Sequence, residues 1–363
     1  MARLKIRIYK RYAETATYRM NFERILVRAT NWIGDAVMSL PALHALRERF
    51  PRSRISILAR PWVAGLYGRE PFCDELIPYD VATGRRGWWE KWRVSRQLSE
   101  GRFDCAILFQ NAFEAAALVW LARIPVRIGY GRDGRGLLLT HPVEVPRAGE
   151  TPPHQRFYYL ELLLRAGLIT SYSLDCPVSL TGSAQAAGEG KRRLEQISFG
   201  RTIAVAPGAA YGGAKRWLAE RFAESAIRLG RELDASVIIL GSAQESPICR
   251  QVSDSIAASG AKCADLSGKT TLPELIELMA ACDLCLTNDS GPMHIASALG
   301  VPTVAIFGST DAAATGPAGV HSRIVQESVE CSPCLLRECP IDHRCMLRVD
   351  ADRVVQVALQ LLK

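Results

Sequence analysis

The sequence has no long apolar run. No stretch of about 18 uninterrupted apolar residues is present, so the chain offers no candidate membrane-spanning helix. The first 24 residues are basic but lack both a continuous apolar block and a small-residue cleavage site, which argues against a secretory signal. We therefore expect a cytoplasmic protein whose 11 cysteines are mostly reduced.

The sequence also lacks an even distribution of charge. The net charge is +8, yet residues 1–170 hold 27 Lys and Arg against 16 Asp and Glu, whereas residues 171–363 hold 18 against 21. A basic half beside a mildly acidic half indicates that one domain meets a polyanion: nucleic acid, an anionic membrane surface or a phosphorylated glycolipid. No recognised nucleic-acid-binding module is present, which disfavours the first of these partners.

Strand-like and helix-like segments alternate along the 363 residues, and the series starts again near residue 200. Such alternation predicts parallel, doubly wound sheets whose ligands bind at the carboxyl ends of the strands. The predicted fold class is α/β, with two Rossmann-like domains facing across a cleft. The expected divisions are a basic extension (1–24), a first domain (25–170), a linker (171–199) and a second domain (200–363), whose last helix could pack back on the first domain.

The segment NWIGDAVMSLPAL (31–43) joins a predicted strand to a predicted helix. Gly34 permits a tight turn, and Asp35 lies at the start of the helix. A carboxylate in this place fits two roles. It can cap the helix by accepting a backbone N–H bond, or it can act as a general base that takes the proton of an attacking hydroxyl.

The segment TNDSGPMHIASALG (287–300) predicts a diphosphate-binding turn. A strand ends at Thr287, and Pro292 lies in the first turn of the next helix, where its missing N–H costs little. Exposed N–H groups and the helix dipole favour an anion there. An ordinary strand-to-helix turn is the alternative. The candidate residues are Asn288, Asp289, Ser290 and Gly291.

Two further loops follow predicted strands of the second domain. The loop 206–217 carries Lys215 and Arg216, which suit a leaving diphosphate, and Glu245 follows a strand end where a carboxylate can accept from ribose hydroxyls. The alternatives are a solvated lysine and a helix start. The match to GxGxxG at 129–134 is set aside, because the residues after it are β-rich and offer no helix N-terminus.

Two clusters allow more than one interpretation. Four cysteines with His343 nearby could hold a structural zinc ion or be packing cysteines, since only the first spacing suits zinc. Three tryptophans among the basic residues of 85–96 could be core anchors or a membrane-interface helix. The cysteines are Cys331, Cys334, Cys339 and Cys345, and the tryptophans are Trp88, Trp89 and Trp92.

Taken together, the motifs resemble the ADP-heptose:lipopolysaccharide heptosyltransferases of glycosyltransferase family nine, and the heptosyltransferase II subgroup among them. The resemblance is carried by ordered segments at 31–43, 127–140, 207–217, 287–310 and 331–346. It implies the GT-B fold and a metal-independent, inverting transfer of heptose from ADP-heptose to the lipopolysaccharide inner core. That acceptor carries acidic sugars and phosphates, which accounts for the basic first half.

The resemblance also implies roles for single residues. Asp35 matches the general base, and Lys215 matches the group that stabilises departing ADP. Donor-binding residues would be Asn288, Asp289, Ser290, Gly291, His294, Glu245 and Arg216. Acceptor-binding residues would be Asn31, Trp32, Arg60, Arg127 and His154. The implied place of work is the inner face of the inner membrane, through peripheral contact.

Three alternatives remain at this point. Another nucleotide-sugar transferase or an epimerase of the same architecture would share the donor motifs, and the epimerase would turn over nucleotide sugar without an acceptor. A nucleic-acid-binding protein would use the basic half and show salt-dependent DNA retention. A degenerate transferase would bind its ligand without turnover, which the presence of both Asp35 and Lys215 disfavours.

Overall fold

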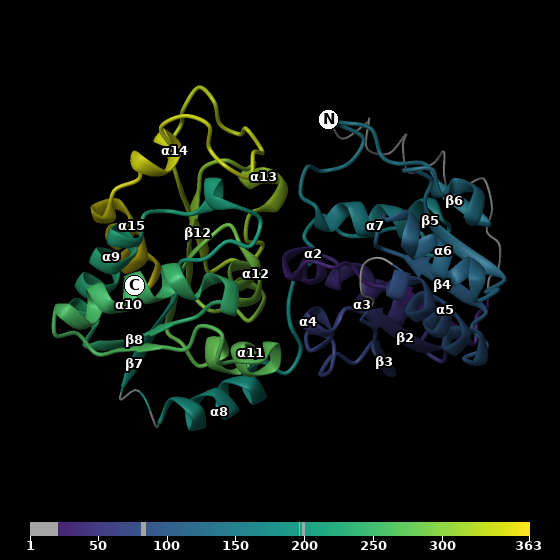
Figure 1. The fold of residues 1–363 in the computed structure, drawn as a ribbon, viewed down its shortest axis with the longest axis horizontal. Helices are drawn as coiled ribbons and strands as arrows, with labels where there is room; N and C mark the ends of the chain where they lie inside the picture. The colour runs from purple at the N-terminus through teal and green to yellow at the C-terminus, as the bar shows by residue number, and fades with distance from the viewer. Residues whose placement is uncertain (1–20, 81–84, 196, 198–199) are drawn as a thin grey trace. The chain divides into compact units, whose positions relative to one another are not determined.

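The structure is a computed structural model that describes residues 21–80, 85–195, 197 and 200–363 (Figure 1). The chain divides into two compact units, residues 1–176 and 177–363. Most of the basic extension expected over residues 1–24 lies outside the described residues.

Six parallel strands form the sheet of the first unit, in the order β3-β2-β1-β4-β5-β6 (Figure 1). The order runs outward from β1 to one edge and restarts beside it with β4, which is the Rossmann arrangement. Every residue of β4 is buried, as expected for a parallel sheet covered on both faces. The strands are β1 (Arg24–Arg28), β2 (Arg54–Ala59), β3 (Glu75–Pro78), β4 (Cys105–Leu108), β5 (Val126–Tyr130) and β6 (His141–Val143).

The helix expected over residues 35–50 is in fact two helices, α2 (Ile33–Met38) and α3 (Leu40–Arg49). Pro41 in the first turn of α3 has no N–H to continue the earlier helix. Ser39 lies between the two helices, and its hydroxyl donates to the carbonyl of Ala36 over 2.7 Å. The other helices are α4 (Pro61–Ala64), α5 (Arg85–Glu100), α6 (Phe113–Leu121), the 3₁₀ helix η1 (Arg135–Leu138) and α7 (Arg156–Arg165).

Helices α5 and α6 pack against each other, and so do α3 and α7. The connections from β1 to β2 and from β4 to β5 run in opposite directions, so right-handed crossovers place these two pairs on opposite faces of the sheet. Val94 and Leu98 of α5 and Val119 of α6 form a core with Leu26 and Leu108 of the sheet.

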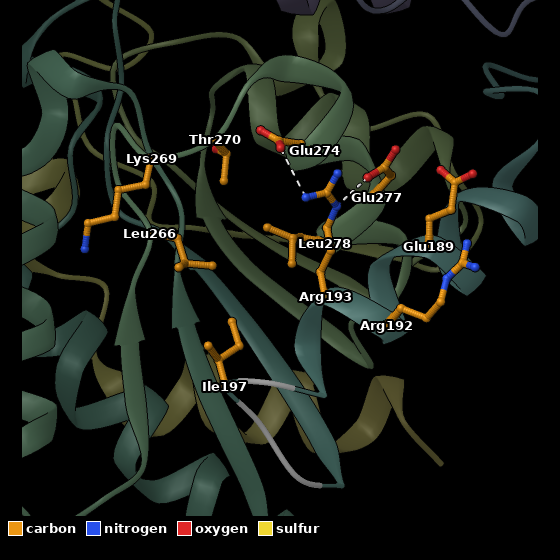
Figure 2. Close-up of a pocket in the computed structure, with 10 residues that line it drawn as sticks. All are labelled: Glu189, Arg192, Arg193, Ile197, Leu266, Lys269, Thr270, Glu274, Glu277 and Leu278. Carbon is orange, nitrogen blue, oxygen red and sulfur yellow. Dashed lines mark hydrogen bonds and ion pairs between the residues drawn. The ribbon is translucent and has the colours of Figure 1, made fainter.

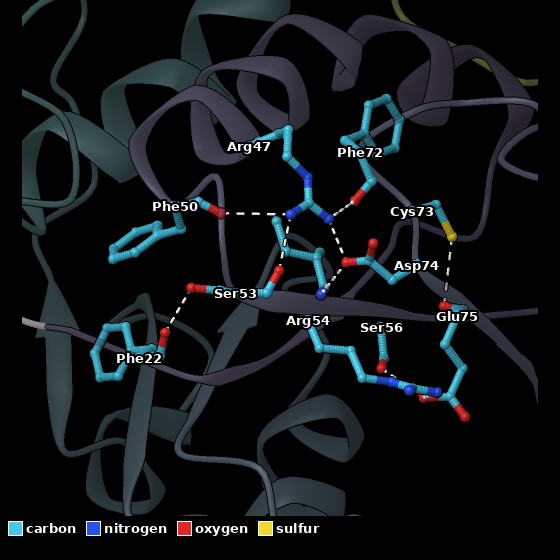
Figure 3. A network of polar contacts seen from close by, with 11 residues as sticks. Phe22, Arg47, Phe50, Ser53, Arg54, Ser56, Phe72, Cys73, Asp74 and Glu75 are labelled. Atoms are coloured by element: carbon cyan, nitrogen blue, oxygen red, sulfur yellow. Dashed lines mark hydrogen bonds and ion pairs between the residues drawn. The ribbon is translucent and has the colours of Figure 1, made fainter.

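Arg47, near the end of α3, is the centre of a polar network at the start of β2 (Figure 3). Its guanidinium donates to the carbonyls of Ser53 over 2.8 Å and Phe72 over 2.9 Å, and it pairs with Asp74. The Asp74 carboxylate also accepts from the backbone N–H of Ile55 over 2.7 Å. This network lies at the amino ends of the strands, so it stabilises the unit at the edge opposite the expected site.

The second unit repeats the Rossmann order with six parallel strands, β12-β11-β10-β7-β8-β9. The strands are β7 (Arg201–Ala206), β8 (Ala235–Ile239), β9 (Cys263–Asp265), β10 (Leu284–Asn288), β11 (Thr303–Phe307) and β12 (Ser322–Gln326). The helices are α8 (Ser183–Leu194), η2 (Gly213–Lys215), α9 (Ala219–Leu233), η3 (Ala243–Glu245), α10 (Ser246–Ala258), α11 (Leu272–Ala280), α12 (Gly291–Ala298), α13 (Ala312–Thr315), α14 (Arg344–Leu347) and α15 (Ala351–Leu361).

Two helices add detail to the expected domain divisions. Residues 183–194, within the expected linker, form α8, which packs on α11 so closely that a Cβ on Gly190 would lie 1.9 Å from the carbonyl oxygen of Glu277. Its buried side is made of Ala186, Gly190 and Leu194, which give little apolar periodicity. The buried face of the last helix, α15, joins the core of the second unit and packs on α9.

Candidate active site

The predicted site residues of both units lie mainly at the carboxyl ends of central strands. In the first unit, Asp35 follows β1, which neighbours β4 at the point where the strand order reverses. In the second unit, Lys215 follows β7 and Ser290 follows β10, the equivalent pair of strands. Ligands of doubly wound sheets bind at such switch points, so the topology supports the sequence-based placement.

Asp35 occupies the third position of α2. The N-cap residue of α2 is Trp32, so the interpretation of Asp35 as an N-cap is wrong. The Trp32 side chain is half-exposed. A carboxylate in the first turn is still favoured by the helix dipole. The hydroxyl of Tyr159 donates to Asp35 Oδ1 over 3.3 Å, from the middle of α7. Asp35 is thus held by a residue 124 positions away in the chain.

Tyr159 was not predicted from the sequence. Its side chain is buried, and burial together with the charge of Asp35 raises the pKa of Tyr159 well above its ordinary value. The phenol therefore stays protonated and remains a donor near neutral pH. The segment FYYLELLLR carries no motif that singles out this tyrosine. Only the packing of α7 on α3 brings it to Asp35.

Two arginines stack on one tyrosine beside Asn31. The guanidinium carbons of Arg28 and Arg60 each lie 4.7 Å from the ring centroid of Tyr79. Arg28 also donates to the Asn31 side-chain oxygen over 2.8 Å, and the Trp62 indole donates to the Asn31 carbonyl over 2.9 Å. Three strand ends, those of β1, β2 and β3, contribute to this cluster.

Arg28 is the unusual member of this cluster. It is only 2% exposed, and among the described residues it forms no ion pair with a carboxylate. Burial lowers its pKa, although the contact with Tyr79 partly opposes this effect. A guanidinium keeps its charge in proteins, so the cluster presents a buried cation close to Asn31. Arg60 is already paired, with Asp80 at 3.4 Å and with Glu114 at 3.7 Å.

The predicted acceptor residues Arg127 and His154 lie outside the arginine cluster. Arg127 lies near the amino end of β5, where its guanidinium donates to the carbonyls of Leu138 over 2.7 Å and Ile124 over 2.5 Å. It stabilises a turn at the amino edge of the sheet, and its acceptor-binding role stays a prediction. His154 precedes α7, and its Nδ1 accepts from the backbone N–H of Arg156 over 3.1 Å.

The N-terminus of α12 has the geometry predicted for an anion site. Ser290 is the N-cap residue, but its side chain makes no capping bond and lies 3.1 Å from the Thr287 hydroxyl instead. Gly291, which has no side chain, is the first residue of the helix and Pro292, which has no N–H, is the second. His294, one turn into α12, is buried. The backbone of this turn can therefore accept an anionic ligand.

Lys215 forms a largely buried ion pair with Asp289, the residue that precedes the N-cap residue of α12. Lys215 Nζ lies 2.6 Å from Asp289 Oδ2, and the Thr310 hydroxyl donates to the same oxygen over 2.7 Å. Lys215 also lies 5.0 Å from the ring centroid of Tyr211. Asp289 thus orients the lysine through this ion pair. A carboxylate is itself a poor partner for a diphosphate, because both are anions.

Asn288 differs from its prediction as a direct donor-binding residue. Its side chain is fully buried, its oxygen accepts from the Trp217 backbone N–H over 3.0 Å, and its amide nitrogen donates to the Pro207 carbonyl over 2.8 Å. Both ends of the amide are therefore used inside the protein. Asn288 ties the end of β10 to the loop that carries Lys215.

Glu245 lies at a helix start, which is one of its two predicted roles. Its Oε2 accepts from the backbone N–H of Ser242 over 2.9 Å in a capping box at the start of η3. A Cβ on Gly208 would lie 2.3 Å from Glu245 Oε1, so only glycine lets the loop after β7 approach this carboxylate. Arg216 folds back on the same loop and donates to the Ala209 carbonyl over 3.3 Å.

The cysteine-containing segment 331–346 packs on the loop that carries Lys215. The backbone N–H of Ala214 donates to the Arg337 carbonyl over 2.9 Å, and His343 Nε2 lies 3.1 Å from the Ala214 carbonyl oxygen. Among the described residues, no group of three or more His, Cys, Asp or Glu is placed to hold a metal ion. The zinc prediction is therefore unsupported, and the segment instead braces the loop.

A pocket of about 540 Å³ lies between α8 and α11 (Figure 2). The Arg193 guanidinium within it pairs with Glu277 at 2.7 Å and with Glu274 at 3.1 Å. None of the predicted donor residues lines this pocket, so it is not the site described above. Its lining residues are Glu189, Arg192, Arg193, Ile197, Leu266, Lys269, Thr270, Glu274, Glu277 and Leu278.

Each unit carries a different reactive group at the carboxyl ends of its strands. The first unit offers a carboxylate that can accept a proton, and the second offers a cation beside a helix N-terminus that can receive an anion.

Among the described residues, no helix is long and apolar enough to cross a membrane.

Comparison with known proteins identifies the family of this chain. The family model "Glycosyltransferase family 9 (heptosyltransferase)" matches residues 91–344. Lipopolysaccharide heptosyltransferase 2 of Salmonella typhimurium is 31% identical over 309 residues, which cover 84% of this chain and 88% of that protein. Lipooligosaccharide heptosyltransferase 2 of Campylobacter jejuni is 26% identical over 342 residues, covering 94% of this chain and 98% of that protein.

Solved structures confirm the predicted fold class. The structure of E. coli ADP-heptose lipopolysaccharide heptosyltransferase II matches with a TM-score of 0.76 and 28% identity, covering 93% of this chain and 98% of that one. A family 9 glycosyltransferase from Veillonella parvula matches with a TM-score of 0.77 and 24% identity, covering 94% and 97%. This chain is therefore a glycosyltransferase that belongs to family 9, the heptosyltransferase family.

Proposed function

We propose that this enzyme transfers heptose from ADP-heptose to the inner core of lipopolysaccharide, as the enzyme that adds the second heptose. The observation that carries the reaction type is Asp35, a carboxylate at the carboxyl end of β1 that is held by a buried tyrosine. The donor and the acceptor are inferred from the relatives, several of which are named lipopolysaccharide or lipooligosaccharide heptosyltransferase 2.

Asp35 acts as the general base in this proposal. It accepts the proton of an acceptor hydroxyl, whose oxygen then attacks the anomeric carbon of the donor and inverts its configuration. The Tyr159 hydroxyl orients the carboxylate without competing for the proton, because its own pKa is raised. The Tyr159 contact thus fixes Asp35 Oδ1 toward α7.

Departing ADP is stabilised by the second unit. Its bond to the anomeric carbon breaks, and negative charge grows on the diphosphate. Lys215 and the backbone N–H groups at the start of α12 provide fixed positive charge and dipoles for this anion, which is typically the largest catalytic contribution. Ser290, Gly291 and His294 remain candidate donor contacts, and Glu245 Oε1 remains a candidate partner of the ribose.

The acceptor is proposed to bind beside the arginine cluster. Arg28 is a buried cation without a carboxylate partner among the described residues, and such a charge is stabilised when an anionic ligand arrives. Asn31, Trp32 and Arg60 surround the same strand ends, and His154 lies two residues before the helix that carries Tyr159. Phosphates and acidic sugars of the inner core are anions of this kind. We place the enzyme in the cytoplasm, at the inner face of the inner membrane.

The direct test is incubation with ADP-heptose and purified truncated lipopolysaccharides, with ADP release and glycan mass as readouts. The proposal predicts ADP release that depends on the acceptor, together with one added heptose mass on an acceptor that already carries the first heptose. Turnover of ADP-heptose at the same rate without any acceptor would contradict it and favour an epimerase or a hydrolase.

A further inference from the structure

Helices α5 and α6 and the 3₁₀ helix η1 expose large apolar side chains that the reaction does not use. The side chains of Trp89 and Leu137 are 75% and 95% exposed, and the other four are about half-exposed. Helix α6 packs on both α5 and η1, so these side chains belong to neighbouring elements of one layer (Figure 1). We call this surface the aromatic face and define it by Trp89, Trp92, Phe113, Trp120, Leu121 and Leu137.

The exposed side of α5 combines aromatic and basic residues. Trp89, Trp92, Arg93 and Arg96 follow one another at spacings of three, one and three residues, so they share one side of the helix. All four are exposed, whereas Val94 and Leu98 point into the core. The two indole rings contact edge to face, with centroids 6.3 Å apart, and the Arg96 guanidinium lies 5.8 Å from the Trp92 ring. Tryptophan next to arginine is typical of membrane interfaces.

Helix α6 continues the surface with apolar residues. Phe113, Trp120 and Leu121 lie at i, i+7 and i+8, which is one side of a helix, while Ala116 and Val119 are buried against the sheet. Exposed apolar residues on one stripe are uncommon in a protein without a partner. The charge nearby selects the partner: residues 85–100 hold five Lys and Arg against two Glu, which favours an anionic surface.

We propose that the aromatic face of the first unit binds the surface of an anionic phospholipid bilayer. The indole and phenyl rings would enter the headgroup region, and Arg93 and Arg96 would contact lipid phosphates. This proposal deepens the proposed function, since a membrane-anchored glycolipid acceptor would explain why the enzyme needs such a surface. It is tested without any transfer reaction, so the two proposals can fail separately.

The test is co-sedimentation of the full-length protein with phosphatidylglycerol-containing vesicles and with phosphatidylcholine vesicles. The variant W89S/W92S/W120S should bind the anionic vesicles at least about tenfold more weakly than the natural sequence. The variant R93E/R96E should be weakened to a similar degree, and its binding should no longer depend on the salt concentration. The matched control V320S/L336S removes exposed apolar side chains of the second unit and should bind like the natural sequence. The basic residues 1–24 are present in every variant, so differences between variants report the aromatic face alone.

Two measurements keep the result interpretable. Unchanged thermal midpoints and unchanged ADP binding show that each variant is folded. Transfer to a short, water-soluble acceptor should also be unchanged, because none of the substituted residues contacts the site. Equal binding of W89S/W92S/W120S and the natural sequence to anionic vesicles would overturn the proposal. A shift of the same variant from dimer to monomer, without any change in vesicle binding, would also overturn it and assign the surface to self-association.

Discussion

The hydroxyl of Tyr159 donates to Asp35 Oδ1 over 3.3 Å, and this contact joins the middle of α7 to the first turn of α2. The tyrosine is buried, and its pKa is raised well above its ordinary value by burial and by the charge of Asp35. The general base of the proposed reaction is therefore oriented by a neutral donor that does not titrate in the working range of pH.

Replacing Tyr159 with Phe removes this donor without creating a large cavity. A hydrogen bond to a charged group is worth about 1.5–3 kcal/mol, so kcat should fall by about tenfold or more. The ionised carboxylate loses stabilisation, so the acid limb of the pH–rate profile should move to higher pH. Tyr172→Phe, which removes a 2.8 Å bond to Glu161 away from Asp35, is the control and should leave the profile in place. A merely structural role for Tyr159 would lower stability with no change in the profile.

Lys215→Met tests the proposed binding site of the departing ADP. The variant removes the cation next to α12 and leaves Asp289 buried with the Thr310 hydroxyl as a partner. We expect kcat to fall by about 100-fold and ADP to bind more weakly, measured by steady-state kinetics and calorimetry. Thr310→Val removes only the second partner of Asp289 and should cost far less. Equal losses in the two variants would mean that Lys215 acts through packing and not through its charge.

Gly212→Ala tests the bracing of the catalytic loop. A Cβ on Gly212 would lie 2.2 Å from the Arg337 carbonyl oxygen, so the loop that carries Lys215 must separate from the segment 331–346. The expected result is weaker ADP binding and lower kcat, with the first unit still folded. Gly188→Ala, where a Cβ meets nothing within 4 Å on α8, is the matched control and should keep full activity. Normal ADP affinity in Gly212→Ala would contradict the bracing role.

Buried thiols predict a loss of stability at alkaline pH. Burial raises the pKa of Cys285 to about 12 and that of Cys249 to about 12, whereas an unfolded thiol titrates near 8.5. Their stabilising contribution is complete below the unfolded pKa and is lost as pH rises toward the folded pKa. The free energy of unfolding should thus fall between about pH 9 and pH 12, by up to about 1.4 kcal/mol per pH unit for each thiol. With the free energy of unfolding measured by urea titration, its fall with pH over this interval should be steeper for the natural sequence than for Cys285→Ala. Parallel dependences on pH would refute the prediction.

Much of the fold follows from local pattern, and much of the site does not. The buried strands and the two strand-to-helix turns at 31–43 and 287–300 were predictable, because apolar runs, glycine and proline mark them directly. The helix α8 was not, because the small residues Ala186 and Gly190 make up most of its buried side and mark it only weakly as apolar. The split of the first helix at Ser39 follows from Pro41, a signal that was present in the sequence.

The site contacts that the sequence does not show have a common cause. Asn288 and Tyr159 contact partners far away in the chain, Trp217 and Asp35, and Arg127 contacts Leu138, 11 positions away. A motif shows which residue types are present, but it does not show whether a side chain is already occupied by the protein itself. Arg28, a charged residue inside the strand ILVRA, was a visible signal of a buried cation.

The most direct test of the account is the rate of ADP release by Asp35→Asn at saturating ADP-heptose and acceptor. The amide keeps the size of the carboxylate and can still accept from the Tyr159 hydroxyl, so the fold of α2 and α7 should survive. The account predicts a fall in kcat of at least about 100-fold with the affinity for ADP unchanged. Retention of more than about a tenth of the activity, below the loss expected for a proton-transfer group, would show that Asp35 is not the base.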